Sequence, residues 1–312
     1  MFNNLRYREY CEAYASDIPL FHQPWWLDAV AGRDQWNGLV SGATFASKPS
    51  ILPIYSTSKW FLSKIHKPAL TTYQGPIWAG YGMLHPLEQM RVVSKTWPDL
   101  IKQIPPTTSF RHTIFPDFQY AYPFHEAGFE LGIRYTYTID LNQPIESIFK
   151  NFRRDVKRKL NKTIDNYQIV ESSDLSLFFP LLNNVYQRQN QPTPFSYAFL
   201  EHLFLSAHEQ AQVKLFLLQG SARHTLGGVL LFYDHQRVYL LASGLNEYGR
   251  KTGTFQQLIW HTLQYFSTSK QVFDFCGSMM GNVVDSNQSM GGLAHAYLEV
   301  SKRKGMVKLL GV

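Results

Sequence analysis

An acid and a thiol stand one residue apart in the stretch Phe-Asp-Phe-Cys-Gly-Ser, residues 273 to 278. Because the side chains of a strand alternate between its two faces, Asp274 and Cys276 are predicted to share one face. Such a pair could act as an acid/base pair, or as a nucleophile with its neighbour. A structural alternative gives the same pattern, since a carboxylate can tie down the Gly277-Ser278 turn through backbone N–H groups. No histidine stands next to Cys276, which favours a packed thiol over a nucleophile.

A second candidate site is the segment from Gly244 to Trp260, where a predicted strand is followed by a glycine-bearing loop and the start of a helix. A helix N-terminus presents unpaired backbone N–H groups and partial positive charge, so it can hold a phosphate. Arg250 and Lys251 would add full positive charges there. On spacing alone, a solvated helix cap explains the same residues.

Residues 145 to 166 form a third candidate, a predicted amphipathic helix with a basic face. Its apolar set is Ile145, Ile148, Phe149, Phe152, Val156 and Leu160, and its basic set is Lys150, Arg154, Lys157 and Arg158. A basic face of this kind can bind phosphates, RNA or acidic lipid by releasing counterions. The alternative is a solvated face supported by pairs such as Glu146 with Lys150.

The composition describes a globular protein with a basic surface. The chain has 312 residues, 45% of them hydrophobic, and a formal net charge of +7, which favours an anionic partner such as a phosphate-bearing ligand, nucleic acid or membrane surface. The 2 cysteines and 11 histidines show no metal-ligand spacing, so no metal is assigned. The N-terminus lacks the apolar segment of a signal peptide, and no stretch is long enough to span a bilayer. We therefore expect a cytoplasmic protein without a transmembrane segment, for which peripheral membrane contact stays open.

The order of predicted elements indicates an α/β chain built in two parts. Prolines crowd the first part and become sparse after Pro123, and a strand at residues 134–141 is predicted to lead into the second part. That part continues with a strand, two helices, three strands, and a helix from about residue 252. A strand at 271–276, a poorly ordered or short helical stretch, and a final strand follow. This order predicts a mixed central sheet.

Several motifs in this order resemble the FemAB-like branch of the GNAT acyltransferase superfamily. They are PLFHQPWWLDAV near the start, RYTYTIDL followed by IFKNFRRDVKRKLNK, the stretch LGGVLLFYDHQRVYLLASGLNEYGRKTGTFQQLIW, and FDFCGSMM with GGLAHAYLEVSK. The resemblance runs over most of the chain. It implies an α/β (α+β) fold of two tandem GNAT-like domains with mixed central sheets. Residues 1–133 would be a degenerate N-terminal domain, and residues 134–312 the acyltransferase domain.

The resemblance also implies roles for site residues. In GNAT proteins a segment of the form R/Q-x-x-G-x-G/A opens a helix and holds the pyrophosphate of an acyl-CoA. The run Arg250, Lys251, Thr252, Gly253 and Thr254 is similar to its beginning. Phe255 stands where the pattern has Gly or Ala, which favours a donor other than acetyl-CoA or a modified pocket. Asp274 is implied to orient or deprotonate the acceptor amine, and Cys276 departs from the Glu or Gly of the family pattern.

By this resemblance we expect a bacterial N-acyltransferase or aminoacyltransferase that acts on an amine of a peptidoglycan or other cell-envelope precursor. Its donor would be an acyl-CoA or an aminoacyl-tRNA. Lys157, Arg158 and Lys159 would attract the phosphate-bearing, nucleotide-linked acceptor. Two alternatives stay open. One is a GNAT-fold protein that binds a phosphate-bearing ligand or RNA without catalysis, which Phe255 and Cys276 favour; the other is an RNA-binding module that binds tRNA through the basic helix.

Overall fold

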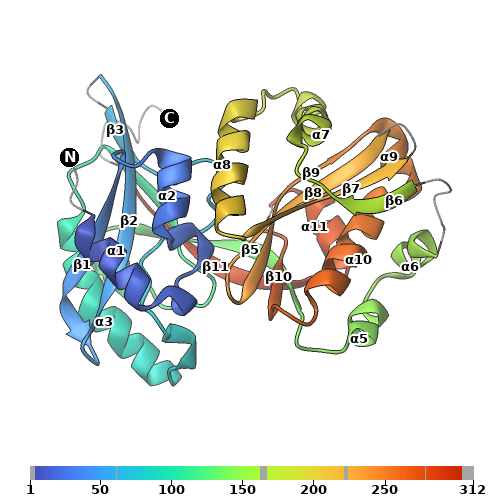
Figure 1. Cartoon of the computed structure of the whole chain (residues 1–312). Coiled ribbons are helices and arrows are strands. Elements are labelled where there is room, and N and C mark those ends of the chain that lie inside the picture. Colours follow the sequence, from blue (N-terminus) through green and yellow to red (C-terminus); the bar gives the residue numbers. More distant parts are fainter. Residues whose placement is uncertain (1–3, 61, 162–166, 221–223, 278, 304–312) are drawn as a thin grey trace. The chain divides into compact units, whose positions relative to one another are not determined.

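The structure is a computed structural model that describes residues 4–60, 62–161, 167–220, 224–277 and 279–303. It divides into two compact units. Of the described residues, unit 1 holds 4–135 and 296–303, and unit 2 holds 136–295. Each unit combines strands with helices packed on them (Figure 1). Among the described residues, no helix is both long and apolar enough to cross a membrane.

Unit 1 opens with two helices and continues into strands that are mostly antiparallel. In chain order its elements are α1 (Leu5–Ala13), α2 (Pro24–Ala31), β1 (Trp36–Phe45), β2 (Lys48–Lys59), β3 (Leu62–Ile65), α3 (Pro86–Gln103), β4 (Ser109–Thr113), α4 (Tyr122–Glu126), the first part of β5 (Glu130–Asp140) and most of β11 (Leu293–Arg303). The strand order is β1-β2-β3-β4-β11, in which β3 and β4 are parallel and the other neighbours antiparallel. The apolar side of α3 packs over β1 and β2.

Large aromatic side chains fill the core of unit 1, and two histidines are buried with them. Trp26, Trp36 and Trp97 are fully buried, and so are His22 and His112. Burial lowers the pKa of His22 to about 4 and the pKa of His112 to about 3, because a charged imidazole would lose its hydration there. Both histidines are therefore neutral in the folded protein at neutral pH.

Unit 2 alternates helices and strands around one sheet. After the end of β5 come α5 (Ile145–Lys150), α6 (Arg154–Leu160), β6 (Tyr167–Glu171), α7 (Leu175–Gln187), α8 (Tyr197–Glu209), β7 (Val213–Gly220), β8 (Thr225–Tyr233), β9 (Arg237–Leu245), α9 (Glu247–Thr252), α10 (Thr254–Phe266), β10 (Val272–Asp274) and α11 (Gly281–Ser289). The strand order is β5-β10-β9-β8-β7-β6, in which β10 and β9 are parallel and the other neighbours antiparallel. The predicted α/β class with a mixed sheet is confirmed.

Helices cover both faces of the unit 2 sheet (Figure 1). Successive residues of β8 point to opposite faces. A Cβ added at Gly227 would lie 2.9 Å from the side chain of Thr254 at the start of α10. A Cβ added at Gly228 would lie 2.9 Å from the ring of Phe178 in α7. The two glycines therefore let both helices approach the same strand closely.

The single helix predicted for residues 145–166 is wrong, although its apolar face is correct. Ile148, Phe152 and Val156 all lie in the core of unit 2. The structure has two helices there, α5 and α6, because the backbone of Arg153 is extended and its N–H donates to the carbonyl oxygen of Ser289 at 2.9 Å. Residues 162–166 lie outside the described residues.

The two units divide the chain differently from the predicted domains at one end. The boundary falls between Tyr135 and Thr136, close to the predicted boundary after residue 133. Residues from Ala296 onward belong to unit 1, whereas the prediction placed them in the domain 134–312. The cause is strand pairing, since residues 299–303 of β11 pair with residues 109–113 of β4.

Candidate functional site

The candidate site begins where two parallel strands of unit 2 separate. β10 pairs with β9 as far as Asp274, which lies opposite Tyr239. β10 ends there, and its chain turns at Cys276 and Gly277, both at positive φ. β9 continues to Leu245, so in the described register its residues 240–245 have no partner in β10. A strand edge of this kind can bond an extended ligand through backbone groups.

This end of β9 leads directly into the predicted donor-binding segment. Asn246 caps α9, since its side chain accepts the N–H of Gly249 at 2.7 Å. α9 ends at Thr252, the next residue Gly253 has a left-handed φ of +80°, and α10 starts at Thr254 without a side-chain cap. The partial positive charge of the α10 N-terminus is therefore not offset by a capping side chain. Phe255, the next residue, packs against the core of unit 2.

The basic helix and the donor-binding segment meet at this junction. Lys159 of α6 lies against Gly253: a Cβ built on the glycine would be 3.0 Å from the Cβ of Lys159 and 3.4 Å from its Cδ. The two groups of predicted site residues are thus brought together from distant parts of the sequence. A lysine beside a helix N-terminus increases the positive potential that an anion meets there.

The other residues of the predicted donor-binding segment differ in exposure. Arg250 and Lys251 are exposed, and Lys251 donates to Glu247 at 2.8 Å. Thr252 is half-buried and its hydroxyl donates back to the α9 backbone, while Thr254 is fully buried. Arg250 and Lys251 are therefore the two residues of this segment that are exposed.

The predicted acceptor-binding residues of α6 also differ from one another. Lys157 turns back to α5, where its Nζ donates to the carbonyl oxygen of Lys150 at 2.8 Å and lies 5.8 Å from the centre of the Phe149 ring. Arg158 is exposed. Lys157 therefore connects the two helices, while Arg158 and Lys159 are the better placed of the three to meet a ligand.

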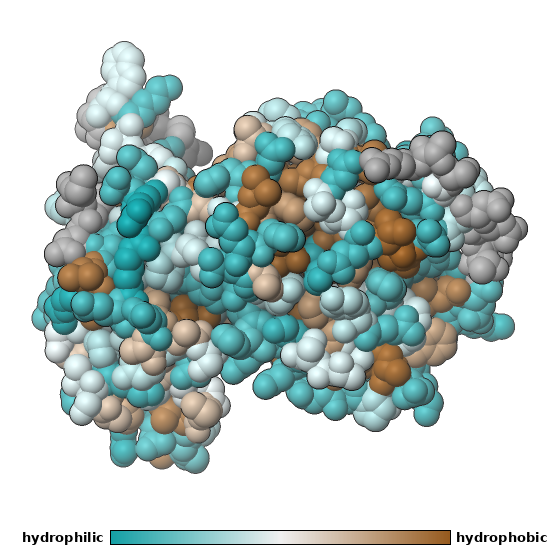
Figure 2. All heavy atoms as spheres, viewed as in Figure 1, coloured by the Kyte–Doolittle hydropathy of each residue, from teal (hydrophilic) through white to brown (hydrophobic). Residues whose placement is uncertain are grey.

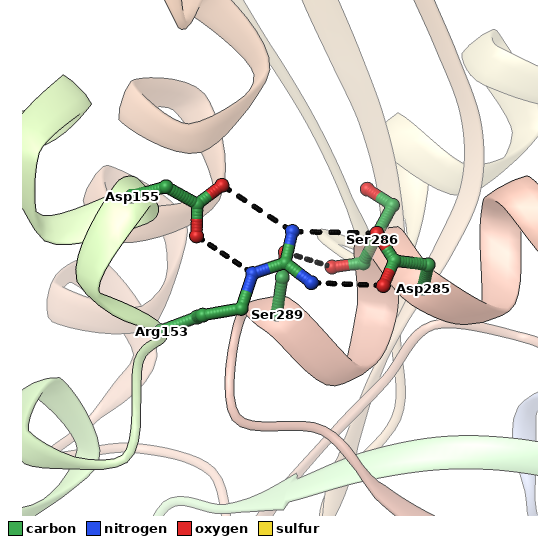
Figure 3. Close-up of polar contacts among 5 residues, drawn as sticks. All are labelled: Arg153, Asp155, Asp285, Ser286 and Ser289. Atoms are coloured by element: carbon green, nitrogen blue, oxygen red, sulfur yellow. Dashed lines mark hydrogen bonds and ion pairs between the residues drawn. The ribbon is translucent and has the colours of Figure 1, made fainter.

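Arg153 fixes the start of α6 against α11 (Figure 3). Its guanidinium lies between two carboxylates: Nε donates to Oδ1 of Asp155 at 2.6 Å, and Nη1 donates to Oδ1 of Asp285 at 2.8 Å. Hydrogen bonding to Asp155, then to Asp285, raises the pKa of Arg153, and the same bond to Arg153 lowers the pKa of Asp155. These bonds connect the start of α6 to α11.

Sequence reasoning missed Arg188, which caps the C-terminal end of α7. Burial and then the positive charge of Arg250 lower the pKa of Arg188, so the two guanidinium groups are close enough for their charges to interact. Two neighbouring cations attract an anion more strongly than one does. The sequence around Arg188 does not reveal its proximity to Arg250, because the packing of α7 on β9 produces that proximity. Gly244 permits that packing, since a Cβ added to it would lie 2.6 Å from the backbone of Leu181.

Asp274, the predicted catalytic residue, is enclosed by donors. It has 0% of its surface exposed. Its Oδ1 accepts the hydroxyl of Thr136 at 2.5 Å and the backbone N–H of Cys276 at 2.8 Å, and its Oδ2 accepts from Nη1 of Arg237 at 3.2 Å. These contacts favour the structural alternative, in which the carboxylate ties down the turn after β10. Thr136 and Arg237 were not identified from the sequence.

A further carboxylate, that of Asp234, binds the backbone of the same arginine. Asp234 accepts the backbone N–H of Arg237 at 2.8 Å and the hydroxyl of Tyr239 at 2.7 Å. Burial, followed by the nearby charge of Asp234, raises the pKa of Tyr239 well above its ordinary value, so the phenol stays a neutral donor. This buried network stabilises the part of the sheet at which β9 and β10 separate.

Replacing Gly253 with alanine tests the geometry of the α9–α10 junction. Gly253→Ala is expected to lower the free energy of unfolding by about 1–2 kcal/mol, because an L-residue is strained at positive φ and the new Cβ would press on Lys159. Gly281→Ala is the matched control, since a Cβ at that first residue of α11 meets nothing within 4 Å. Denaturant titration measures both variants. Equal stability of the two would contradict this description of the junction.

Comparisons with known proteins agree with this arrangement. Residues 150–282 match the model of the acetyltransferase (GNAT) domain. Among solved structures, FemX is similar with a TM-score of 0.67 over 96% of this chain and 96% of its own, at 11% sequence identity. The chain has a FemAB-like GNAT-superfamily fold.

Two further solved structures share this FemAB-like GNAT fold. L-PGS from Bacillus licheniformis is similar with a TM-score of 0.55 at 10% identity, over 99% of this chain and 94% of its own. A tandem GNAT protein from the clavulanic acid biosynthesis pathway is similar with a TM-score of 0.51 at 8% identity, over 86% of this chain and 83% of its own. No curated protein is similar enough in sequence to match. The predicted fold of tandem GNAT-like domains is confirmed, and it is a fold of acyl-transferring proteins.

Proposed function

We propose that unit 2 binds an activated acyl donor at the junction of α9 and α10 and transfers its acyl or aminoacyl group to an amine of a cell-envelope precursor, in the bacterial cytoplasm. The observation that carries this proposal is the separation of β9 from β10 directly before that junction. An extended donor can bond to the edge of β9 beyond Tyr239 while its phosphates bind at the start of α10.

The donor carries phosphates next to an activated carbonyl, as an acyl-CoA or an aminoacyl-tRNA does. The match to the GNAT domain model supports an acyl-CoA, and the likeness to FemX together with the basic α6 supports an aminoacyl-tRNA. In this proposal Arg250 and Lys159 bind the phosphates, and Arg188 adds a third positive charge.

The proposed transfer does not require a covalent intermediate on the protein. The acceptor nitrogen attacks the carbonyl carbon of the thioester or ester, an amide bond forms, and the thiol or the tRNA hydroxyl leaves while the amine loses a proton. The protein contributes by aligning the two reactants and by donating backbone N–H bonds to the developing oxyanion. Asp274 acts through the turn that it holds, while Arg158 attracts the phosphate-bearing acceptor.

Arg250→Ala tests the donor site. Because a hydrogen bond between an arginine and a phosphate contributes about 1.5–3 kcal/mol, the variant is expected to bind its donor about tenfold or more weakly. Thermal-shift screening of the whole chain against acyl-CoAs and aminoacyl-tRNA identifies the donor, and titration gives the affinities. Lys95→Ala removes an exposed cation of unit 1 and is expected to leave donor affinity unchanged. Equal affinities of Arg250→Ala and the unmodified chain would contradict this assignment.

A second candidate function is a binding protein of the same fold that does not catalyse transfer. The enclosure of Asp274 favours it, since that carboxylate does not reach solvent to act on an acceptor amine. This candidate predicts donor binding that depends on Arg250 but no amide product when donor and acceptor are mixed with the protein. Formation of amide product that is lost in Arg250→Ala would exclude it.

A further inference from the structure

We propose that the tip of the β2–β3 hairpin in unit 1 docks on an anionic lipid surface, with Trp60 inserting between the headgroups. This proposal concerns a different unit from the proposed acyl transfer and does not depend on it. Trp60 is the most exposed of the large hydrophobic residues that the structure describes, with 89% of its surface accessible.

The position of Trp60 in the hairpin is unusual for its residue type. Lys59 pairs with Leu62, so Trp60 lies in the turn between the two strands. Trp60 has a φ of +60°, a conformation in which two-residue turns prefer asparagine or glycine. A bulky aromatic residue there is strained and contributes nothing to the core of unit 1. Both features favour a role for the ring outside the folded unit.

The end of the hairpin is hydrogen-bonded to the loop that precedes β4. Close to the tip, at Ser63, which pairs with Ser58, the hydroxyl of Thr107 donates to the carbonyl oxygen of Ser63 at 2.8 Å, and the N–H of Thr108 donates to the same oxygen at 3.0 Å. The end of the hairpin projects from unit 1 in the ribbon view (Figure 1) and stands out from its surface in the space-filling view (Figure 2). The tryptophan is therefore carried on a supported arm.

The charge around the tip matches an anionic surface. Lys59 is exposed beside Trp60, and Lys64 follows in β3. Residues 35–87 contain no aspartate or glutamate, so no acidic side chain of this long segment opposes approach to negative headgroups. Basic residues near an anionic bilayer are attracted to it at short range.

The chemistry favours a lipid surface over RNA as the partner. Tryptophan rings concentrate at the boundary between headgroups and acyl chains, where the apolar ring is buried and the indole N–H stays hydrated. Proteins that bind single-stranded RNA instead stack successive bases on several aromatic residues along a basic groove. A single described tryptophan at the end of a projecting hairpin fits the first arrangement.

Sedimentation with vesicles tests the proposal on the whole chain. The unmodified chain is expected to bind vesicles that contain phosphatidylglycerol. Binding is expected to weaken at high salt, and to be weaker still with vesicles of pure phosphatidylcholine. Trp60→Asn is expected to reduce binding by about tenfold or more, while its thermal stability stays equal or rises because asparagine suits the turn. Met83→Ser is the matched control, because Met83 of unit 1 is 80% exposed but lies outside the hairpin.

Three results would overturn the proposal. The first is that the unmodified chain does not bind the phosphatidylglycerol vesicles. The second is that Trp60→Asn and the unmodified chain bind them equally, and the third is that Met83→Ser loses as much vesicle binding as Trp60→Asn does. Binding to single-stranded RNA that is lost in Trp60→Asn, without vesicle binding, would assign the hairpin to RNA instead. Acyl transfer to a soluble acceptor, if measured, is expected to be unchanged in Trp60→Asn.

Discussion

Arg237→Met is expected to lower the free energy of unfolding by about 3–5 kcal/mol, since removing one partner of a buried ion pair leaves the other charge uncompensated. The side chain of Arg237 is 11% exposed and its partner Asp274 is 0% exposed. The substitution keeps much of the aliphatic volume of the side chain, so the loss reports on the charge. Denaturant titration of the whole chain measures it.

The matched control for this prediction is an exposed ion pair in unit 1. Arg111 lies 3.0 Å from Glu299, but the arginine side chain is 55% exposed. Water and salt screen such a pair, so Arg111→Met is expected to lower the free energy of unfolding by about 1 kcal/mol or less. A loss in Arg237→Met no larger than in Arg111→Met would contradict the description of Asp274 as an enclosed, arginine-paired carboxylate.

Acid is expected to destabilise unit 1 through its two buried histidines. In the unfolded chain a histidine takes up a proton below about pH 6.5, whereas in the folded protein the pKa of His22 is about 4 and that of His112 about 3. Their neutral forms therefore give full stability above about pH 6.5, and stability is lost as the pH falls below that value. At pH 5 each histidine is expected to have lowered the free energy of unfolding by about 2 kcal/mol.

The slope of stability against pH, rather than stability itself, tests this prediction. His22→Gln and His112→Gln are each expected to flatten the loss between pH 7 and pH 5, whatever they cost at neutral pH. His125→Gln, which removes an exposed histidine of unit 1, is expected to leave the slope unchanged. Equal slopes in all three variants and the unmodified chain would show that other groups cause the acid sensitivity.

Local patterns in the sequence predict the order of helices and strands well, because period and proline placement act locally. They miss the break between α5 and α6, since Phe152 and Val156 keep helical spacing across it. The break depends instead on the hydrogen bond from the backbone N–H of Arg153 to the carbonyl oxygen of Ser289, a residue far away in the chain. The return of residues 296–303 to unit 1 is missed for the same reason, because β11 pairs with β4, a strand far away in the sequence.

In the candidate site, too, features set by neighbouring residues are predictable from the sequence, and features set by distant residues are not. The run from Arg250 to Thr254 is visible as a motif, and Gly253 has the left-handed backbone that such a junction needs. The sequence does not reveal which of its side chains reach solvent, nor that Lys159 lies against Gly253. The enclosure of Asp274 is likewise invisible, because its partners Thr136 and Arg237 lie on other strands.

The proposed function depends on a phosphate-bearing acyl donor that binds along the edge of β9 and at the start of α10. Hydrogen exchange of the whole chain with and without acyl-CoA, and with and without aminoacyl-tRNA, measures it most directly, since bound amides exchange more slowly. We expect that one of these donors slows exchange at residues 240–257, and that Arg250→Ala weakens the effect. Protection confined to other residues, or no protection by either donor at concentrations that saturate known acyltransferases, would contradict the proposed donor site.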